Sequence, residues 1–564
     1  MKNTIICLVI LGIPILLWFV SGAIQDWHYV FDDAFITYRY AKNLAMGHGI
    51  TWNPGHPPTE GYTNFLLVVF LAPFIKAGLD PLLVTRILSY LSIVAMTWIL
   101  FVVAKRQYSC TTTTGIMIAA LILLVPQTRN LCLVGLETII YALFLLIAFL
   151  MGIRFLDSRR TFHSVSFSVL VILTMLLRPE AALIYPIVLV LYFTHRGAGQ
   201  AIEIKPMILG LGILLALGGT YMAWKALHFG HLLPNPFYIK VSDNAFISSL
   251  GAESVKTFIT RNAILLALAY ASLMYSFSAT TYHRQKTRIS ILLGLSFITV
   301  YACFFVRTDT LMDINGRFMY PLLPILICLT IPALSAALTA LESRVGNKGA
   351  LSFSGMVVAF MFAFTPNGII NSFEDIKNLT PNNKWKTSDE LMQKEFRIAL
   401  QLSTFPGIEN LRIAFSDSGV IPYYTGSIWL DVTGLNDSTI ARTRNREQLL
   451  NYFFGFQADL VIHPSNKGFN WISWDHGPLG DYTSWSNDPR WDEYLYVGTS
   501  KTYEPMYDLQ YFVRKSSPYY KSLKDFLETK IVDGWYKPLP YNIGTWIFDR
   551  KMQPAWIPRS EPRA

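Results

Sequence analysis

Residues 82–104 read "LLVTRILSYLSIVAMTWILFVVA", an apolar run in which Arg86 is the only charged residue. A helix of this length can cross a hydrocarbon core of about 30 Å. The chain as a whole has the same character, because 52% of its 564 residues are hydrophobic and 15% are charged, whereas soluble domains carry about 25% charged residues. This composition excludes an ordinary soluble enzyme and predicts a polytopic α-helical membrane protein.

Similar apolar blocks predict eleven transmembrane helices in all. They lie near residues 4–22, 82–104, 112–127, 133–152, 164–177, 180–194, 206–227, 261–278, 289–306, 318–340 and 349–366. The block at 63–77 is shorter and contains Pro73 and Lys76, so we expect it to lie along the membrane surface. Residues 1–23 have a second interpretation as a cleaved signal peptide.

The distribution of Lys and Arg favours this count of spans. With a cytoplasmic N-terminus, the basic clusters near 105–106, 154–160, 196–205, 284–288 and 344–348 all fall inside, as the positive-inside rule requires. Counting 63–77 as a span would place every one of them outside. We therefore expect an external C-terminus. The net charge of +10 is explained by these loops, so no nucleic-acid partner is predicted.

After residue 366 the long apolar blocks stop, which predicts two domains: a transmembrane catalytic domain at 1–366, with its first external loop at 24–81, and an extracytoplasmic domain at 367–564. Strand-like runs such as "LRIAFSD", "ADLVIHP" and "EYLYVG" predict a mixed α/β fold for the second domain. Its many Trp residues are interpreted either as core and interface anchors or as a glycan-binding surface.

Two adjacent carboxylates begin the external stretch "FDDAFITYRYAKNLAMGHGITWNPG", residues 31–55, which has a helical pattern. One Asp at a helix start is usually an N-cap. Holding Asp32 and Asp33 side by side costs like-charge repulsion, so the second carboxylate needs another role. It is either a general base or, with its neighbour, a ligand for a divalent metal cation.

Basic residues also lie at the outer ends of the predicted spans, against the inside bias. Arg178 and Arg317 are the strongest candidates for binding a phosphate, although such side chains also snorkel to lipid headgroups. Glu137 would be costly at its depth unless it is paired, so we expect it to meet Arg178, Arg129 or the ligand.

Several motifs occur in the order known from one family. They are "DDAFITYRYAKNLAMGHGITWNPG", "EGYTNFL", "GLET", "RPE", "LPNPFYIK" and "DSGVIPYYTGSIWLDVTGLND". The chain resembles, over its whole length, the mycobacterial terminal arabinofuranosyltransferase (AftB) family of the GT-C superfamily, which also contains the lipid A aminoarabinose transferases. The resemblance implies that the catalytic carboxylate falls on Asp32 or Asp33 and that a juxtamembrane helix follows at 63–77. The motif residues expected to contact substrate are Arg39, Glu60, Tyr62, Asn64, Glu137, Arg178, Glu180, Asn235, Tyr238, Lys240, Arg317 and Asp417.

The resemblance implies a glycosyltransferase that moves D-arabinofuranose from a polyprenyl-phosphate donor to a glycan or glycoprotein hydroxyl, on the outer face of the cytoplasmic membrane. No nucleotide or other cofactor is required, although Asp32 and Asp33 are candidate metal ligands. This chain is richer in Ile, Asn and Lys than actinobacterial relatives, which leaves the acceptor open: arabinan, lipopolysaccharide, capsule or pilin. The alternatives are a transferase for lipid-linked mannose or aminoarabinose, a transporter of lipid-linked glycans, and a glycan-binding protein without catalysis.

Overall fold

The computed structural model describes residues 30–194, 203–240, 247–277, 282–310, 312–340, 395–465, 487–500 and 508–532, with isolated positions outside these ranges. The chain forms two compact units. The bundle unit contains residues 1–27, 85–224 and 241–380. The sheet unit contains residues 28–84, 225–240 and 381–564. The predicted domain boundary near 366 lies outside the described residues.

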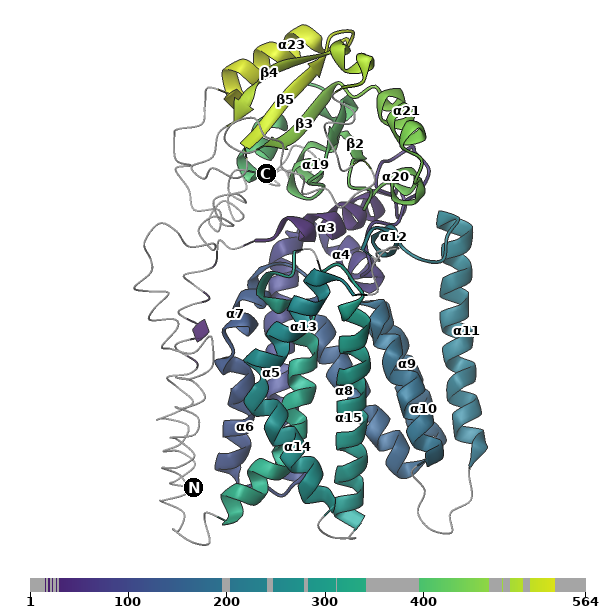
Figure 1. Cartoon of the computed structure of the whole chain (residues 1–564), viewed down its shortest axis with the longest axis vertical. Helices are drawn as coiled ribbons and strands as arrows, with labels where there is room; N and C mark the ends of the chain where they lie inside the picture. Colours follow the sequence, from purple (N-terminus) through teal and green to yellow (C-terminus); the bar gives the residue numbers. More distant parts are fainter. Residues whose placement is uncertain are drawn as a thin grey trace, which may run out of the picture. The chain divides into compact units, whose positions relative to one another are not determined.

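Apolar helices make up the bundle unit (Figure 1). Five are long and apolar enough to cross a membrane: α5 (Pro81–Gln107), α8 (Thr138–Ser158), α11 (Ile204–Phe229), most of α15 (Tyr282–Val306), and Tyr320–Ala340. The shorter ones are α6 (Thr112–Leu124), α7 (Pro126–Leu133), α9 (Thr161–Met175), η2 (Pro179–Leu183), α10 (Ile184–Thr194), α13 (Ser249–Arg261), α14 (Ala263–Phe277), η3 (Ile314–Gly316) and η4 (Tyr320–Leu322). Nine of the eleven predicted spans coincide with described helices, while 4–22 and 349–366 fall outside the described ranges.

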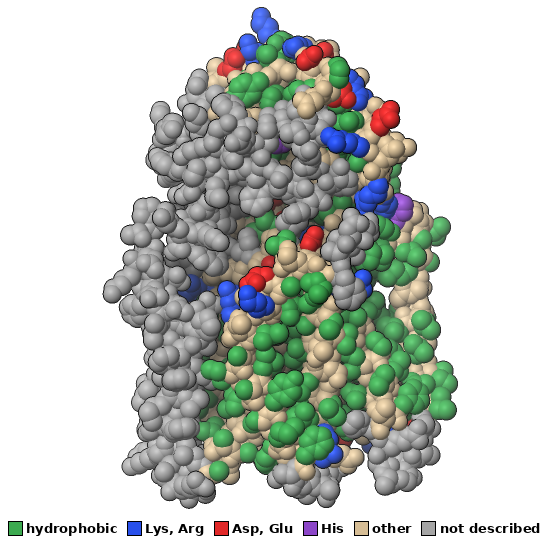
Figure 2. All heavy atoms as spheres, viewed as in Figure 1, with side chains coloured by type: hydrophobic (Ala, Val, Ile, Leu, Met, Phe, Trp, Pro, Cys, Tyr) green, Lys and Arg blue, Asp and Glu red, His purple; other side chains and the backbone are tan. Residues whose placement is uncertain are grey.

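Two helix pairs of the bundle unit are sharply bent. Between α6 and α7 the axis turns by 58°, because Val125 takes an extended conformation before Pro126. Between α13 and α14 it turns by 70° at Asn262. Counting each pair as one span raises the total to seven among the described residues. Hydrophobic side chains cover the bundle face shown in Figure 2, and Leu91, Trp98 and others are largely exposed, as expected of helices that meet lipid.

A five-stranded mixed sheet is the core of the sheet unit, with strand order β2-β1-β3-β5-β4. The strands are β1 (Arg412–Phe415), β2 (Ile428–Asp431), β3 (Leu460–Ser465), β4 (Tyr494–Ser500) and β5 (Asp508–Arg514). β1 pairs in parallel with β2 and with β3, whereas β5 pairs antiparallel with β3 and with β4. Its remaining helices are α19 (Val420–Thr425), α20 (Ser438–Arg442), α21 (Arg446–Phe456), α23 (Tyr520–Phe526), η5 (Ile408–Asn410), η6 (Pro489–Glu493) and η7 (Leu527–Val532). The predicted mixed α/β fold is confirmed.

The segment predicted to be the first external loop folds within the sheet unit through α3 (Asp32–Ala45) and α4 (Phe65–Lys76), and α12 (Asn235–Lys240), from later in the chain, belongs to the same unit. Figure 1 shows α19 beside α3. The Arg39 guanidinium on α3 donates to the carbonyls of Pro422 (2.5 Å), Ser427 (2.8 Å) and Trp52 (3.0 Å). Lys42 donates to the Tyr423 carbonyl at 3.0 Å. A buried cation needs such acceptors, so these two side chains fix α3 to the C-terminal segment.

α4 is too short, at 12 residues, to cross a bilayer. One face, with Leu67, Val68 and Leu71, is buried, whereas Val69 and Phe70 on the other are about 40% exposed. This apolar helix with one exposed face is compatible with the predicted membrane-surface position of 63–77, which stays a prediction.

Candidate functional site

Asp32 does not cap its own helix. Phe31 holds the N-cap position of α3 and makes no side-chain capping bond, so the N-cap interpretation of the acidic pair is wrong. Asp32 instead accepts a hydrogen bond at Oδ1 from the Val420 amide (2.7 Å), and the Gly419 amide also hydrogen-bonds to this carboxylate. The carboxylate therefore binds the first amides of α19, far away in sequence.

Gly419 is required for this contact. A Cβ built on Gly419 would overlap the carboxyl group and the carbonyl oxygen of Asp32. Only a residue without a side chain lets the two backbones approach this closely. The position of Asp32 thus depends on a glycine in the C-terminal segment.

Asp417 lies just beyond the carboxyl end of β1. The chain crosses from β1 to β2 on one side and later returns to β3 on the other, which makes this strand end a topological switch point. Such strand ends form crevices that commonly carry functional groups. Burial raises the pKa of Asp417 to about 7, the charges of Asp33 and Asp431 act in the same direction, and hydrogen bonds with Glu395 and Ser416 oppose them.

Asp32, Asp33 and Asp417 together form what we call the acidic cluster. The pKa of Asp32 is raised well above its ordinary value, first by burial and then by the charges of Asp417 and Asp33. The amides of Val420 and Gly419 lower it, but burial outweighs them. The pKa of Asp32 and the pKa of Asp417 are both raised, the latter to about 7, so the cluster binds a proton more tightly than isolated carboxylates do and can exchange it near neutral pH.

Asp431 has a structural role in the same crevice. It is fully buried and accepts hydrogen bonds from the amides of Thr433 (3.0 Å) and Asn436 (2.8 Å), and from both of their side chains. These contacts build the turn after β2.

The other predicted residues of the sheet unit gather around the loop after α3. Glu60 forms a buried ion pair with Lys225 at 2.9 Å, and its carbonyl accepts from the Asn235 amide at 2.9 Å. Tyr62 packs edge-on against Tyr40, with ring centroids 4.7 Å apart. Asn64 hydrogen-bonds to Thr37, and Tyr238 and Lys240 lie on α12, partly exposed. Arg39 also contacts this loop, because its guanidinium donates to the Trp52 carbonyl and to Asn53 Oδ1, each at 3.0 Å.

In the bundle unit, the structure brings Glu137, Arg178 and Glu180 together. Arg178 donates from Nε to Glu180 Oε1 at 2.6 Å and from Nη1 to Glu137 Oε1 at 3.1 Å. The predicted pairing of Glu137 with Arg178 is confirmed. The guanidinium groups of Arg178 and Arg317 lie 5.1 and 4.9 Å from the ring centroid of Phe318, so the two arginines are neighbours. The charge of Arg178 is balanced by these two carboxylates.

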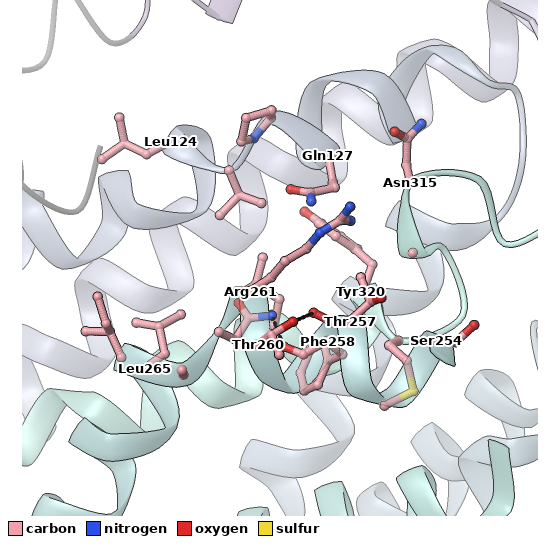
Figure 3. A pocket seen from close by; sticks show the side chains of 18 of the residues that line it. Leu124, Gln127, Ser254, Thr257, Phe258, Thr260, Arg261, Leu265, Asn315 and Tyr320 are labelled. Carbon is pink, nitrogen blue, oxygen red and sulfur yellow. Dashed lines mark hydrogen bonds between the residues drawn. The ribbon is translucent and has the colours of Figure 1, made fainter. Parts of the chain in front are cut away.

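A pocket of about 270 Å³ opens beside Gly316, the residue before Arg317. It is lined at both helix breaks, by Val125 and Pro126 from one and by Asn262 from the other. Figure 3 shows Arg261 extending towards Gln127 and Tyr320, with Leu124 and Leu265 to one side. A cationic group at one side and apolar side chains at the other suit an amphipathic ligand.

Metal ligation receives no support from geometry. Within the described ranges, no three His, Cys, Asp or Glu side chains are grouped so that they could hold a metal ion. Asp32 and Asp33 as metal ligands therefore stay a prediction.

Comparisons with known proteins define the fold. A family model for a domain of unknown function, DUF8728, matches residues 389–520. No curated protein matches the chain. The structure is similar to that of ArnT from Cupriavidus metallidurans bound to undecaprenyl phosphate, with a TM-score of 0.51 and 13% identity, covering 88% of this chain and 97% of that one. The apo state of the same enzyme gives a TM-score of 0.48 and 14% identity, covering 79% and 92%.

At this identity the similarity shows the fold alone. The chain has the GT-C type of fold that the motifs predicted, with a C-terminal mixed-sheet domain. The comparisons do not support the AftB branch in particular.

Some residues of these sites escaped sequence reasoning. Gly419 stands inside a quoted motif, but only its contact with Asp32 shows its importance. Glu395 and Arg261 carried no signal, because a single charged residue on a helix is most often solvated surface.

Proposed function

We propose that this protein is a glycosyltransferase that moves a sugar from a polyprenyl-phosphate donor to an acceptor hydroxyl on the outer face of the cytoplasmic membrane. The acidic cluster is the observation that carries the proposal. Its raised proton affinity suits a general base working near neutral pH. The fold of ArnT, which was solved with undecaprenyl phosphate bound, supports the choice of donor.

The proposed reaction is a direct displacement at the anomeric carbon. The acceptor oxygen forms a bond to this carbon while its proton passes to the carboxylate of Asp32 or Asp33. The bond from the anomeric carbon to the phosphate oxygen breaks, and the polyprenyl phosphate leaves with the electron pair. Asp417 can hold the proton that the cluster shares, which leaves a neighbouring carboxylate ionised to act as the base.

Phosphate binding is assigned to the bundle unit. Arg178 and Arg317, which both lie against the ring of Phe318, are proposed to stabilise the negative charge that develops on the departing phosphate. The pocket at the two helix breaks receives the first part of the lipid chain against Leu124 and Leu265. Binding energy from this remote part of the donor can be used to orient the reacting centre.

The sugar is proposed to be D-arabinofuranose, on the strength of the ordered motifs. Aminoarabinose is the second candidate, because the fold is that of ArnT. Both are pentoses on the same type of carrier, so the proposed chemistry is common to them.

The proposal is tested on the purified full-length protein in nanodiscs. The protein is supplied with a glycan acceptor and with synthetic polyprenyl-phosphate arabinofuranose, aminoarabinose or mannose as the donor. We expect release of polyprenyl phosphate with one of these donors, and a loss of about 10²–10⁴-fold in Asp32→Asn or Asp33→Asn. The control is Asp488→Asn, which changes a partly exposed Asp of the same unit that pairs with Arg490 at 2.7 Å, and it should keep full activity. Transfer at the wild-type rate by both cluster variants would reject the proposal.

A further inference from the structure

Two short helices of the sheet unit, α12 and α20, face each other with polar side chains. The Ser438 hydroxyl donates to Asn235 Oδ1 at 3.3 Å, and the Arg442 guanidinium lies over the ring of Tyr238, 4.7 Å from its centroid. Asn235 and Tyr238 are one turn apart on α12, and Ser438 and Arg442 are one turn apart on α20. Asn235 and Arg442 therefore belong to one helix interface.

This interface contains buried hydrogen-bond donors that have no acceptor among the described residues. Within the described part of the chain, Arg442 Nε, Arg442 Nη1 and Asn235 Nδ2 are buried and have no hydrogen-bond partner. Asn235 is fully buried. Unpaired buried donors are costly, and most of all on a cation, so a missing acceptor is the natural explanation.

The nearby charges do not supply that acceptor. Glu60 is the acid that acts on Arg442, but it is bound to Lys225 at 2.9 Å, and each of these two side chains is only 5% exposed. Arg444 adds a third cation and donates to the carbonyls of Ala441 (3.0 Å) and Tyr238 (3.3 Å). The cluster thus combines three cations with one carboxylate.

His231 is a further titratable group on which the charge of Arg442 acts. Burial lowers its pKa, and the charge of Arg442 lowers it further, so it is neutral at physiological pH. Arg442 itself is partly exposed.

We propose that Arg442 and Asn235 form an oxyanion site that binds a carboxylate or phosphate group carried by the acceptor glycan. A guanidinium presents two parallel N–H groups to two oxygens, which suits both anions, and the Asn235 amide supplies a third donor. The ring of Tyr238 packs against the Arg442 guanidinium group, with its centroid 4.7 Å from Cζ. Anion binding by Arg442 and Asn235 does not depend on the proposed function. The identification of that anion as a group of the acceptor glycan rests on the proposed function.

Binding is measured on the full-length protein without any donor, by the shift in thermal unfolding temperature and by calorimetry. The probes are inorganic phosphate, glucuronate and, as the neutral comparison, glucose, each at constant low ionic strength because salt screens the interaction. We expect phosphate or glucuronate to raise the unfolding temperature of the wild type, and glucose to leave it unchanged. If only phosphate raises the unfolding temperature, the site binds phosphate groups. If glucuronate raises it, the site binds the carboxylates of sugar acids.

Arg442→Gln is expected to weaken oxyanion binding by at least about tenfold. In the absence of anion it should unfold no earlier than the wild type, since it removes unpaired buried donors. Arg412→Gln is the matched control, because Arg412 is a partly exposed arginine of the same unit that lies over Phe456 at 5.1 Å, and its binding should be unchanged.

Two results would overturn the inference: no response of the wild type to either anion, or an equal response in Arg442→Gln. The binding assay needs no transfer reaction. Loss of binding in Arg442→Gln by a protein that transfers no sugar would therefore keep the oxyanion site while rejecting the proposed function.

Discussion

Replacing Asp417 by Asn is expected to stabilise the protein at high pH and to leave its stability unchanged at low pH. Burial and the charges of Asp33 and Asp431 raise the pKa of Asp417 from 3.8 to about 7 in the folded chain. Below about pH 4 the group is protonated in both folded and unfolded chains. As the pH rises from about 4 to about 7, the unfolded chain loses this proton while the folded chain retains it, so the free energy of unfolding falls.

The size of the effect follows from the two pKa values. A rise from 3.8 to about 7 corresponds to at most about 4 kcal/mol of destabilisation above pH 7. Because Asp417 is partly exposed, solvent reduces this, and we expect about 1–2 kcal/mol. Asn has nearly the same shape but no charge, so Asp417→Asn should recover this free energy while losing transfer activity, as is common for residues strained by function.

The assay is thermal unfolding of the purified protein at pH 4.5 and pH 8, followed by tryptophan fluorescence. The control, Asp488→Asn, should show a small change of the opposite sign, because hydrogen bonds from Arg490 lower the pKa of that partly exposed carboxylate. If Asp417→Asn lowered the unfolding temperature equally at both pH values, the carboxylate would be a structural acceptor and the reasoning would be refuted.

Three further changes test the site. Gly419→Ala should displace Asp32 and lower both the transfer activity and the unfolding temperature. The control, Gly455→Ala, changes a helical glycine with open space around it and should be neutral or stabilising by up to about 1 kcal/mol. Equal effects of the two variants would contradict the close approach of Gly419 to Asp32. Arg178→Met should cost about 3–5 kcal/mol in unfolding free energy because two buried carboxylates lose their partner, and a cost below 1 kcal/mol would argue against the ion-pair network. Leu265→Trp should fill the pocket and raise the KM for a long-chain donor with little change in kcat, and an unchanged KM would place the lipid elsewhere.

The sequence by itself determined the class of protein. Apolar blocks such as 82–104 must form helices in a membrane, because unpaired backbone groups are too costly in lipid, and the structure has helices at each predicted span that it describes. The alternating runs of the C-terminal region likewise predicted β1, β3 and β4. The acidic pair was conspicuous because like charges side by side need a reason. In each case the signal is local, carried by composition or by a short periodic pattern.

Only the tertiary structure decided what each acid does. Sequence reasoning gave one of the pair to the N-cap of α3, whereas Asp32 binds the amides of α19, about 390 positions later in the chain. Burial and the charges of Asp33 and Asp431 give Asp417 its high proton affinity. The fold brings these two acids close to Asp417, because neither is its neighbour in the sequence. The two guanidinium nitrogens of Arg442 that have no hydrogen-bond partner among the described residues lie where α12 packs against α20. Burial and long-range contacts set the charge state of a group, and neither is written in the residues beside it.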